Sequence, residues 1–264
     1  MKSFAKLVSL SIQSKIYFRQ SFILNLFTPV VLLVGSYLLW NSLYTLQGGI
    51  IGTMNRADMF TYILISFAIN NLLTWSTENV ISREITHGTI TSKCIRPVPF
   101  ILQMVSEMTG SMLIQGSMNL AVALLGFLLF SKYLILPTLS SLLLFIPCLI
   151  LGVLLRIMMT NVFSLLCFFT TSHLGISWTR NAIYDFFSGA VVPVAMFPLW
   201  LKSFTYFTPF PYMLQAPISI FLNQPMPVSY GAVLLLQLFY ILLLLLLHHV
   251  IYGHVRKNLT IAGG

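Results

Sequence analysis

The sequence predicts an all-α polytopic membrane protein with six transmembrane helices, and three observations carry this prediction. Of its 264 residues, 58% are hydrophobic and only 7% are charged, with a mean hydropathy of +0.91. A soluble protein carries about 25% charged residues, because its surface must meet water. The apolar residues also gather into stretches long enough to cross the ~30 Å hydrocarbon core of a bilayer. We therefore expect residues 1–264 to form a single transmembrane domain.

The basic residues favour a lipid bilayer as partner and argue against nucleic acid. The net charge is +9. The basic side chains flank apolar stretches, which is where such residues set topology and meet anionic headgroups. The three cysteines, Cys94, Cys148 and Cys167, show neither CxxC nor His/Cys spacing. Neither a disulfide framework nor a zinc site is expected.

The expected elements begin with an amphipathic helix at residues 1–20. Lys2 and Lys6 fall on one helical face and Phe4 and Leu7 on the opposite face, which is typical of a helix lying in the membrane interface. Six spanning helices are expected after it, at residues 21–42, 59–80, 101–130, 138–172, 180–198 and 231–252.

The distribution of basic residues predicts that both termini are cytoplasmic. With the N-terminus inside, only Arg56, Lys132 and Lys202 lie in outer segments. The inner segments hold the larger set: Lys2, Lys6, Lys15, Arg19, Arg83, Lys93, Arg96, Arg180, Arg256 and Lys257. Lys and Arg accumulate in cytoplasmic loops, so we expect a multi-pass protein of the cell membrane in this orientation.

The fourth stretch, residues 138–172, is longer than a bilayer requires and contains Arg156. One long helix that protrudes into the cytoplasm is the preferred interpretation. Two spans turning at Arg156 would make seven spans and place the basic C-terminal tail outside. An arginine at the bilayer centre costs on the order of 3 kcal/mol, so we expect Glu107 or Asp185 as its partner, with snorkelling to inner headgroups as the alternative.

Helix-breaking residues interrupt the apolar segment 189–229 before the last span. The segment includes Gly189, Pro193, Pro198, Trp200 and Pro209. Irregular backbone at membrane depth must be buried in protein or line a wet cavity. The pattern therefore predicts a re-entrant or interfacial helical pair on the outer side, with an ordinary apolar external loop as the alternative.

Catalytic motifs are missing from the sequence. No G-x-x-x-x-G-K-[ST] phosphate loop occurs, so the chain is not expected to hydrolyse ATP by that route. His248 and His249 are adjacent and point about 100° apart on a helix, which does not suit a shared metal ion. We expect no catalytic residue, no metal and no cofactor bound by this chain.

A polar hairpin at residues 81–98 separates the second and third spans. Arg83, Glu84 and His87 lie within one helical turn, Gly88 ends that turn, and Arg96-Pro97 directs the chain back into the membrane. Any six-span protein needs a solvated inner loop, and composition alone favours that plainer interpretation.

Two blocks of sequence resemble the ABC-2 type exporter permeases. The first comprises Glu84-Ile85, Gly88-Thr89-Ile90 and Ile95-Arg96-Pro97-Val98, which resemble the family's cytoplasmic E-I-x-x-G-T-[IL] and [LI]-R-P-[VIL] stretches. The second comprises Ser188-Gly189, Val192-Pro193, residues 197–201, Pro209-Phe210 and residues 216–218, which resemble its outer segment. With six spans around them, the resemblance covers nearly the whole chain.

The resemblance implies a membrane subunit of an ATP-binding cassette exporter. Two separate ATPase subunits, which bind ATP and Mg, would dock on the hairpins of this chain and of a second permease, identical or paralogous. The positions implied for coupling are Arg83, Glu84, His87, Gly88, Thr89, Ile90, Arg96 and Pro97.

The spans that line the pathway in this family carry amides and aromatic rings here. Candidate lining residues are Trp40, Asn70, Asn71 and Trp75. Such a pathway suits a hydrophobic or amphipathic cargo moved outward by alternating access. For each residue taken singly, helix packing or anchoring at the membrane interface is the favoured explanation. The alternative function is a stand-alone ion-coupled secondary transporter using Glu107 and Asp185, and an intramembrane enzyme ranks last.

Overall fold

A computed structural model describes residues 6–10, 19–52, 54–72, 77–129, 134–170 and 173–258. This part of the chain is mostly α-helical. Its only strands are the two-residue β1 (Ile50–Ile51) and β2 (Met54–Asn55), which pair as a hairpin. The predicted all-α class is therefore confirmed.

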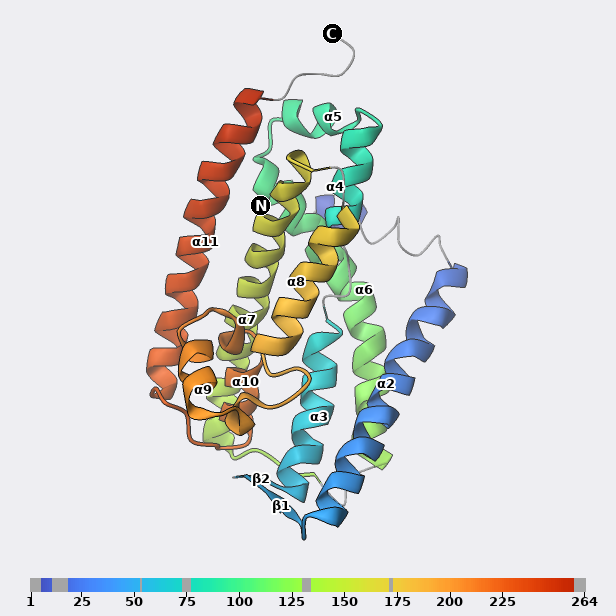
Figure 1. Cartoon of the computed structure of the whole chain (residues 1–264). Helices are drawn as coiled ribbons and strands as arrows, with labels where there is room; N and C mark the ends of the chain where they lie inside the picture. Colours follow the sequence, from blue (N-terminus) through green and yellow to red (C-terminus); the bar gives the residue numbers. More distant parts are fainter. Residues whose placement is uncertain are drawn as a thin grey trace.

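Long helices running side by side form the body of the molecule (Figure 1). They are α2 (Arg19–Leu46), α3 (Arg56–Asn70), α6 (Phe100–Leu129), α7 (Leu139–Leu165), α8 (His173–Phe187) and α11 (Tyr230–Asn258). α7 packs against α6, α8 and α11, and its buried residues Cys148 and Leu155 belong to the largest core cluster. α7 is thus the helix around which the others assemble.

The two ends of the bundle carry different short elements (Figure 1). α4 (Thr77–Thr86), α5 (Ile90–Ile95) and the 3-10 turn η2 (Leu166–Phe168) lie at what we call the hairpin end. Towards the other end lies the segment that the sequence predicts to be on the outer side, residues 189–229, which we call the outer segment. It contains η3 (Val194–Met196), α9 (Leu199–Tyr206), η4 (Phe210–Tyr212) and α10 (Gln215–Phe221).

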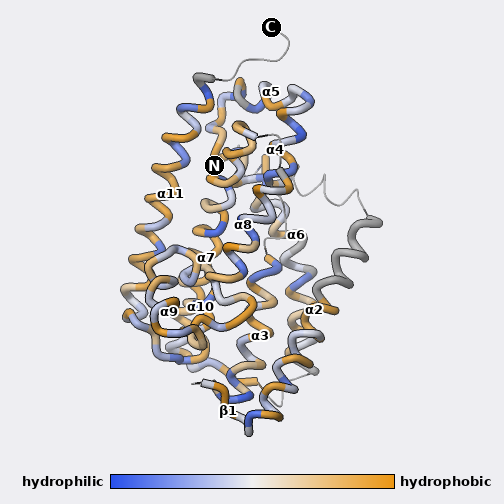
Figure 2. Tube along the Cα trace, in the orientation of Figure 1, coloured by the Kyte–Doolittle hydropathy of each residue, from blue (hydrophilic) through white to orange (hydrophobic). Residues whose placement is uncertain are grey.

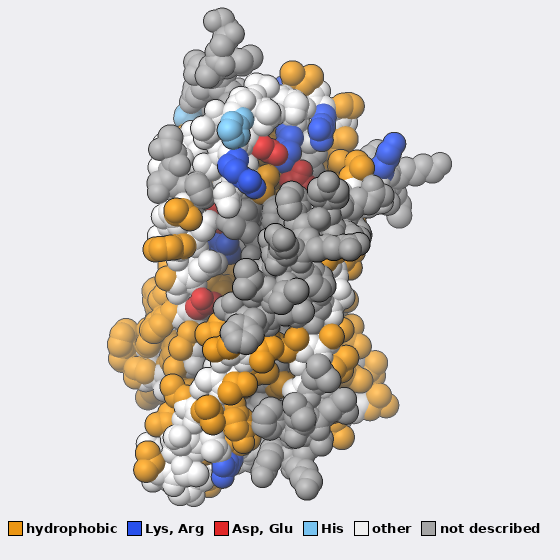
Figure 3. Space-filling model, turned by 90° about the vertical axis from the view of Figure 1, so that its right-hand side faces the viewer, with side chains coloured by type: hydrophobic (Ala, Val, Ile, Leu, Met, Phe, Trp, Pro, Cys, Tyr) orange, Lys and Arg blue, Asp and Glu red, His pale blue; other side chains and the backbone are white. Residues whose placement is uncertain are grey.

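The outside of the bundle is apolar. Leu235, Leu242 and Leu246 of α11 are all exposed, and Figure 2 shows α11 as mainly hydrophobic along its length. Figure 3 shows hydrophobic side chains over the middle of the molecule and charged ones gathered near the hairpin end. These leucines lie away from the buried Val233 and Leu244, and contact with lipid explains their exposure because lipid does not penalise apolar surface.

Within the described residues, two helices are long and apolar enough to cross a bilayer, Leu139–Phe168 and Tyr230–Arg256. Two shorter helical stretches, Val30–Leu46 and Phe100–Ile114, are also apolar. Each of the six expected spans overlaps one helix of the bundle, yet α3 and α8 contain only 15 residues each. The number of spans stays a prediction.

The second expected span, residues 59–80, is not one continuous helix. α3 ends at Asn70 and α4 begins at Thr77. The Asn71 side chain donates to the Phe67 carbonyl at 2.9 Å. An asparagine offers the backbone such local alternatives to the helical pattern, and this favours a helix end.

The fifth expected span, residues 180–198, is displaced. α8 begins earlier, at His173, and ends at Phe187, before Gly189. Gly189 has φ +87°, and a Cβ there would lie 2.7 Å from Tyr62 Oη and 2.8 Å from Gln215 Oε1. Only glycine fits this turn, so the helix must stop before it.

The fourth expected span is a single helix. α7 runs without a break through Arg156, so the alternative with a turn at this residue is wrong. Thr138 caps its N-terminus by accepting from Ser141 N.

The outer segment folds onto α7 instead of forming an extended loop. Residues 211–220 are all buried, and a Cβ on Gly152 of α7 would lie 3.1 Å from the Met213 carbonyl oxygen. A small residue on α7 therefore permits close approach of the irregular backbone. α9 and α10 are the helices found in this segment, and its depth in the membrane stays a prediction. Of the expected helix at 1–20, residues 6–10 are helical and 1–5 and 11–18 lie outside the described residues.

Candidate functional site: the α4–α5 hairpin

An apolar inner face fixes the α4–α5 hairpin to the bundle. Ile81 of α4 and Ile90 at the start of α5 are buried in a cluster with Met104 of α6 and Leu165 of α7. Because these isoleucines come from two short helices that cannot be stable alone, their burial against the long helices is what orders the hairpin.

The turn between the two helices is closed by local hydrogen bonds. His87 N donates to the Arg83 carbonyl at 2.9 Å and Gly88 N to the Ile85 carbonyl at 3.1 Å. Gly88 has φ +71°, a conformation that favours glycine. Thr89 Oγ1 donates back to the Glu84 carbonyl at 3.4 Å. The tip of the hairpin therefore has a defined shape.

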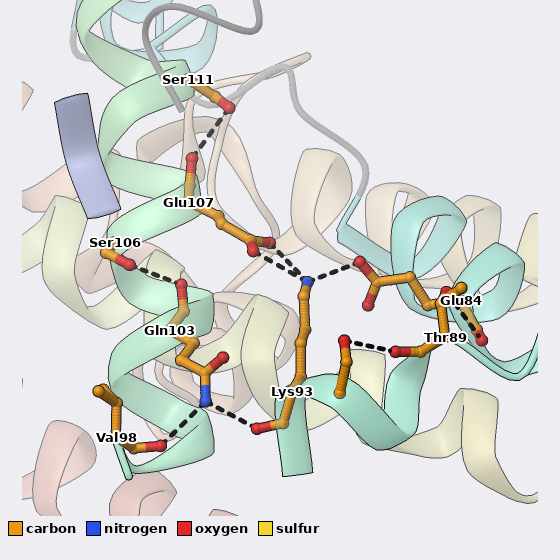
Figure 4. A network of polar contacts seen from close by, with 9 residues as sticks. Glu84, Thr89, Lys93, Val98, Gln103, Ser106, Glu107 and Ser111 are labelled. Atoms are coloured by element: carbon orange, nitrogen blue, oxygen red, sulfur yellow. Dashed lines mark hydrogen bonds and ion pairs between the residues drawn. The ribbon is translucent and has the colours of Figure 1, made fainter. Parts of the chain in front are cut away.

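Lys93 of α5 joins three helices through its ammonium group (Figure 4). Its Nζ lies 2.8 Å from Glu84 Oε1 of α4 and 2.9 Å from Glu107 Oε1 of α6. The Lys93 side chain is only 7% exposed, whereas the two carboxylates keep partial contact with water. Charge-assisted bonds of this kind are stronger than neutral ones and fix the angle between the hairpin and α6.

The return of the chain into α6 is held by Gln103. Its Nε2 donates to the carbonyls of Lys93 and Val98, both at 2.9 Å (Figure 4). These bonds span the Arg96-Pro97 turn, where proline restricts the preceding residue to an extended conformation. The turn and the Lys93 cluster are consequently parts of one braced unit.

The predicted coupling residues fall into two sets on this hairpin. Ile90 is buried and Glu84 faces Lys93, so these two point into the protein. The others form an exposed outer face: Arg83, His87, Gly88, Thr89, Arg96 and Pro97. The structure brings all eight together in one hairpin, and their role in coupling stays a prediction.

A buried ion pair missed by the sequence reasoning ties α4 to α8. Arg180 Nε lies 2.5 Å from Glu78 Oε1, and the Glu78 side chain is fully buried. The sequence predicts Arg180 at the cytoplasmic start of the expected fifth span, 180–198, and names no partner for it. The available signal was the scarcity of acidic residues, which makes an isolated glutamate at a span end a candidate for pairing.

Arg156 contacts a carbonyl and a ring. Its Nη1 donates to the Asn70 carbonyl at 2.9 Å, and its guanidinium carbon lies 4.1 Å from the centre of the Tyr184 ring. Asp185 lies within electrostatic range of it. The other predicted partner, Glu107, is found in the ion pair with Lys93. Arg156 thus links the C-terminal end of α3 to α8.

The candidate pathway residues do not lie together in the structure. Asn70 and Asn71 lie half-buried at the end of α3, where Asn119 of α6 donates to the Asn71 carbonyl at 2.9 Å. Trp40 is buried in an apolar cluster with Tyr44. Trp75 lies outside the described residues.

The predicted outer residues mark element boundaries. Gly189 follows α8, whereas Pro193, Pro198 and Pro209 directly precede η3, α9 and η4. Proline suits these positions because it has no N–H to be satisfied at a helix start. Trp200 is 73% exposed on α9, beside other exposed apolar side chains. Among the residues that the structure describes, no group of three His, Cys, Asp or Glu side chains is placed to hold a metal ion.

Fold and site together define an α-helical membrane protein with a rigid polar hairpin at one end of an apolar bundle. The family of ABC-2 family transporter proteins matches residues 30–263, and the chain belongs to this family. The family resemblance predicted from the two sequence blocks is confirmed. Comparison with curated proteins gives no match. The chain is therefore a membrane component of an ABC transporter, and its family implies association with ABC ATPase subunits.

Proposed function

We propose that this chain is the permease subunit of an exporter in the cell membrane, with both termini and the hairpin end in the cytoplasm. It works with two ATPase subunits and a second permease chain, identical or paralogous. ATP and Mg are bound by the ATPases. The cargo is a hydrophobic or amphipathic molecule that leaves on the outer side by alternating access.

The observation that carries this proposal is the double attachment of the hairpin. Lys93 links α4 and α5 to α6, and the Glu78–Arg180 pair links α4 to α8. A displacement of the hairpin is therefore transmitted to two long helices through short, strong contacts. ATP favours the closed ATPase dimer, and closure can reorient a permease only through contacts that differ between the two states.

The centre of the bundle supports a cargo site near the break between α3 and α4. Interrupted membrane helices commonly mark binding sites, because their free backbone groups orient a substrate. Asn70, Asn71 and Arg156 lie at this break. The surrounding residues are mainly apolar, which suits a cargo with a large apolar part and a few polar groups.

The alternative of a stand-alone ion-coupled transporter is less well supported. Such a mechanism needs intramembrane carboxylates that bind and release a proton or another cation. Glu107 is ion-paired with Lys93, and Asp185 lies in electrostatic range of Arg156. Both candidate carboxylates therefore have a permanent counter-charge nearby.

Reconstitution tests the proposal. The full chain, purified from membranes with the ATPase that accompanies it, is placed in proteoliposomes, and ATP-dependent movement of amphipathic dyes is measured. We expect transport that requires ATP and survives collapse of ion gradients by ionophores. Gly88→Leu, which forces a branched residue to φ +71°, and His87→Ala should uncouple hydrolysis from transport without preventing insertion. Transport driven by an ion gradient without ATP would instead establish the alternative.

A further inference from the structure

All acidic residues of the chain can be placed, and none is available to form an acidic docking face at the hairpin end. The sequence contains five. Asp58 caps α3 at the far end, and Asp185 is half-buried in the bundle. The other three, Glu78, Glu84 and Glu107, lie at the hairpin end, and each is ion-paired with Arg180 or Lys93.

The basic residues at the same end are distributed differently. Arg83, His87 and Arg96 are exposed on the hairpin, and His254 and Arg256 are exposed on the last turns of α11. In Figure 3 the acidic side chains near this end adjoin basic ones, whereas other basic side chains stand apart. The exposed charge that can reach a partner is therefore positive.

We propose, resting on the function proposed above, that the hairpin docks on an acidic surface of the ATPase subunit, with Arg83 and Arg96 facing its carboxylates. Glu84, which the sequence suggested as a docking residue, acts inward by holding Lys93. Because Lys93 and Gln103 brace the hairpin, the backbone that carries Arg83 and Arg96 is held in place before docking, which limits the backbone entropy lost on binding.

Anionic lipid headgroups are the other class of negative surface that a basic face can meet. The tip of the hairpin favours a protein partner. It lies at the extreme end of the bundle, beyond the apolar middle of the molecule (Figures 1 and 3). Basic residues that serve headgroups lie at the edge of the apolar belt, since the headgroup field weakens within about 10 Å.

The test measures the affinity of the permease for its ATPase in nanodiscs of zwitterionic lipid only, so that lipid charge does not contribute. Arg83→Glu and Arg96→Glu are compared with Lys202→Glu. The control makes the same change in net charge on α9, far from the hairpin. Arg83→Gln serves as a milder variant, and thermal melting confirms that each protein is folded.

We expect each reversal in the hairpin to weaken binding about tenfold or more and Lys202→Glu to leave it unchanged, because charge pairs at an interface act locally. Raising the salt concentration should weaken wild-type binding and not that of the reversed variants. Replacing a carboxylate of the ATPase groove by lysine should restore binding to Arg83→Glu.

Equal affinity of wild type and hairpin variants overturns the inference while leaving the proposed function intact, since the ATPase still binds. The measurement is then repeated in nanodiscs that contain anionic lipid, and an effect of the hairpin variants that appears only there also overturns the inference and assigns the face to headgroups. If the wild-type chain binds no ATPase at all, the proposed function fails as well.

Discussion

At the hairpin end, side chains are joined by ion pairs, whereas the outer segment is joined to the bundle by neutral hydrogen bonds. Lys93 lies between two carboxylates and Arg180 binds Glu78. In the outer segment, Gln237 Nε2 donates to the Tyr212 carbonyl at 2.7 Å, and Tyr240 Oη donates to the Phe207 carbonyl at 2.6 Å. Ion pairs thus hold the hairpin end to the bundle, and neutral hydrogen bonds hold the outer segment to it.

The difference follows from what each region must satisfy. The outer segment has irregular backbone among apolar residues, so its free carbonyls need donors that bring no charge into that environment. The hairpin is joined to α6 and α8 where Glu84 and Glu107 keep partial exposure, and charged side chains are tolerated there. Charge reversal should therefore disturb the hairpin end and not the outer segment, and loss of the Gln237 donor should disturb the outer segment in a way that salt does not change.

The largest effect is expected from breaking the buried ion pair. Arg180→Met leaves the fully buried Glu78 carboxylate without its guanidinium, and we expect the free energy of unfolding to fall by about 3–5 kcal/mol. Denaturation of the detergent-solubilised protein, followed by helix content, measures the loss. The double variant Glu78→Met/Arg180→Met should recover most of it. A loss below about 1 kcal/mol in the single variant would show that the ion pair contributes little to the stability of the fold.

Gly189→Ala should have the next largest effect, now on the outer segment. An alanine at φ +87° costs about 1–2 kcal/mol, and its Cβ must displace Tyr62 Oη or Gln215 Oε1, which adds about 1–3 kcal/mol. The melting temperature reports the change. Gly231→Ala is the matched control, because no atom lies within 4 Å of its added Cβ and its φ is not in the left-handed region. Equal melting temperatures for the two variants would contradict the assigned strain.

Gln237→Leu tests the neutral hydrogen bonds between α11 and its neighbours directly. It removes the donor from the Tyr212 and Cys148 carbonyls, and we expect a loss of about 1–3 kcal/mol that does not change with salt. Chemical denaturation at low and high ionic strength distinguishes this from a charge effect. Gln47→Leu, at an exposed position, should be close to neutral. A strong salt dependence for Gln237→Leu would count against the comparison.

Lys93→Met should change stability least, by about 1 kcal/mol, because Glu84 and Glu107 keep 22% and 30% side-chain exposure and water screens their charges. Its main effect should be functional: ATP hydrolysis continues while transport falls, since the hairpin no longer moves α6. Lys93→Arg keeps the charge and should retain coupling. If Lys93→Met transports normally per ATP hydrolysed, the Lys93 ion pairs are not needed for coupling.

Much of the helical framework could be predicted from the sequence, because apolar length is a local property. The expected stretches 101–130 and 231–252 overlap α6 and α11 closely. The fourth stretch also proved to be one helix despite Arg156. The errors lie at Asn70 and Gly189, where tertiary contacts decide the helix ends. Tyr62 and Gln215, which make glycine necessary at 189, are far from it in the sequence.

The sequence predicted which segment forms the candidate site, but not which of its side chains face the bundle. The motif identified the hairpin, but it could not tell that Glu84 and Ile90 face inward and that Arg83 and Arg96 face outward. Glu84 faces inward because Lys93 lies between it and Glu107, and Glu107 belongs to another helix, α6. Pairs across helices are not encoded in any local spacing.

The Glu78–Arg180 pair also has a consequence for biosynthesis, because its members are separated by 102 positions in the chain. A ribosome adds about 5–20 residues per second, so Glu78 emerges about 5–20 s before Arg180 exists. During that interval the carboxylate cannot be enclosed in its final surroundings. α4 can therefore reach its final packing only after α8 has been made. Completion of α8 is thus a condition for enclosing the Glu78 carboxylate at the hairpin end.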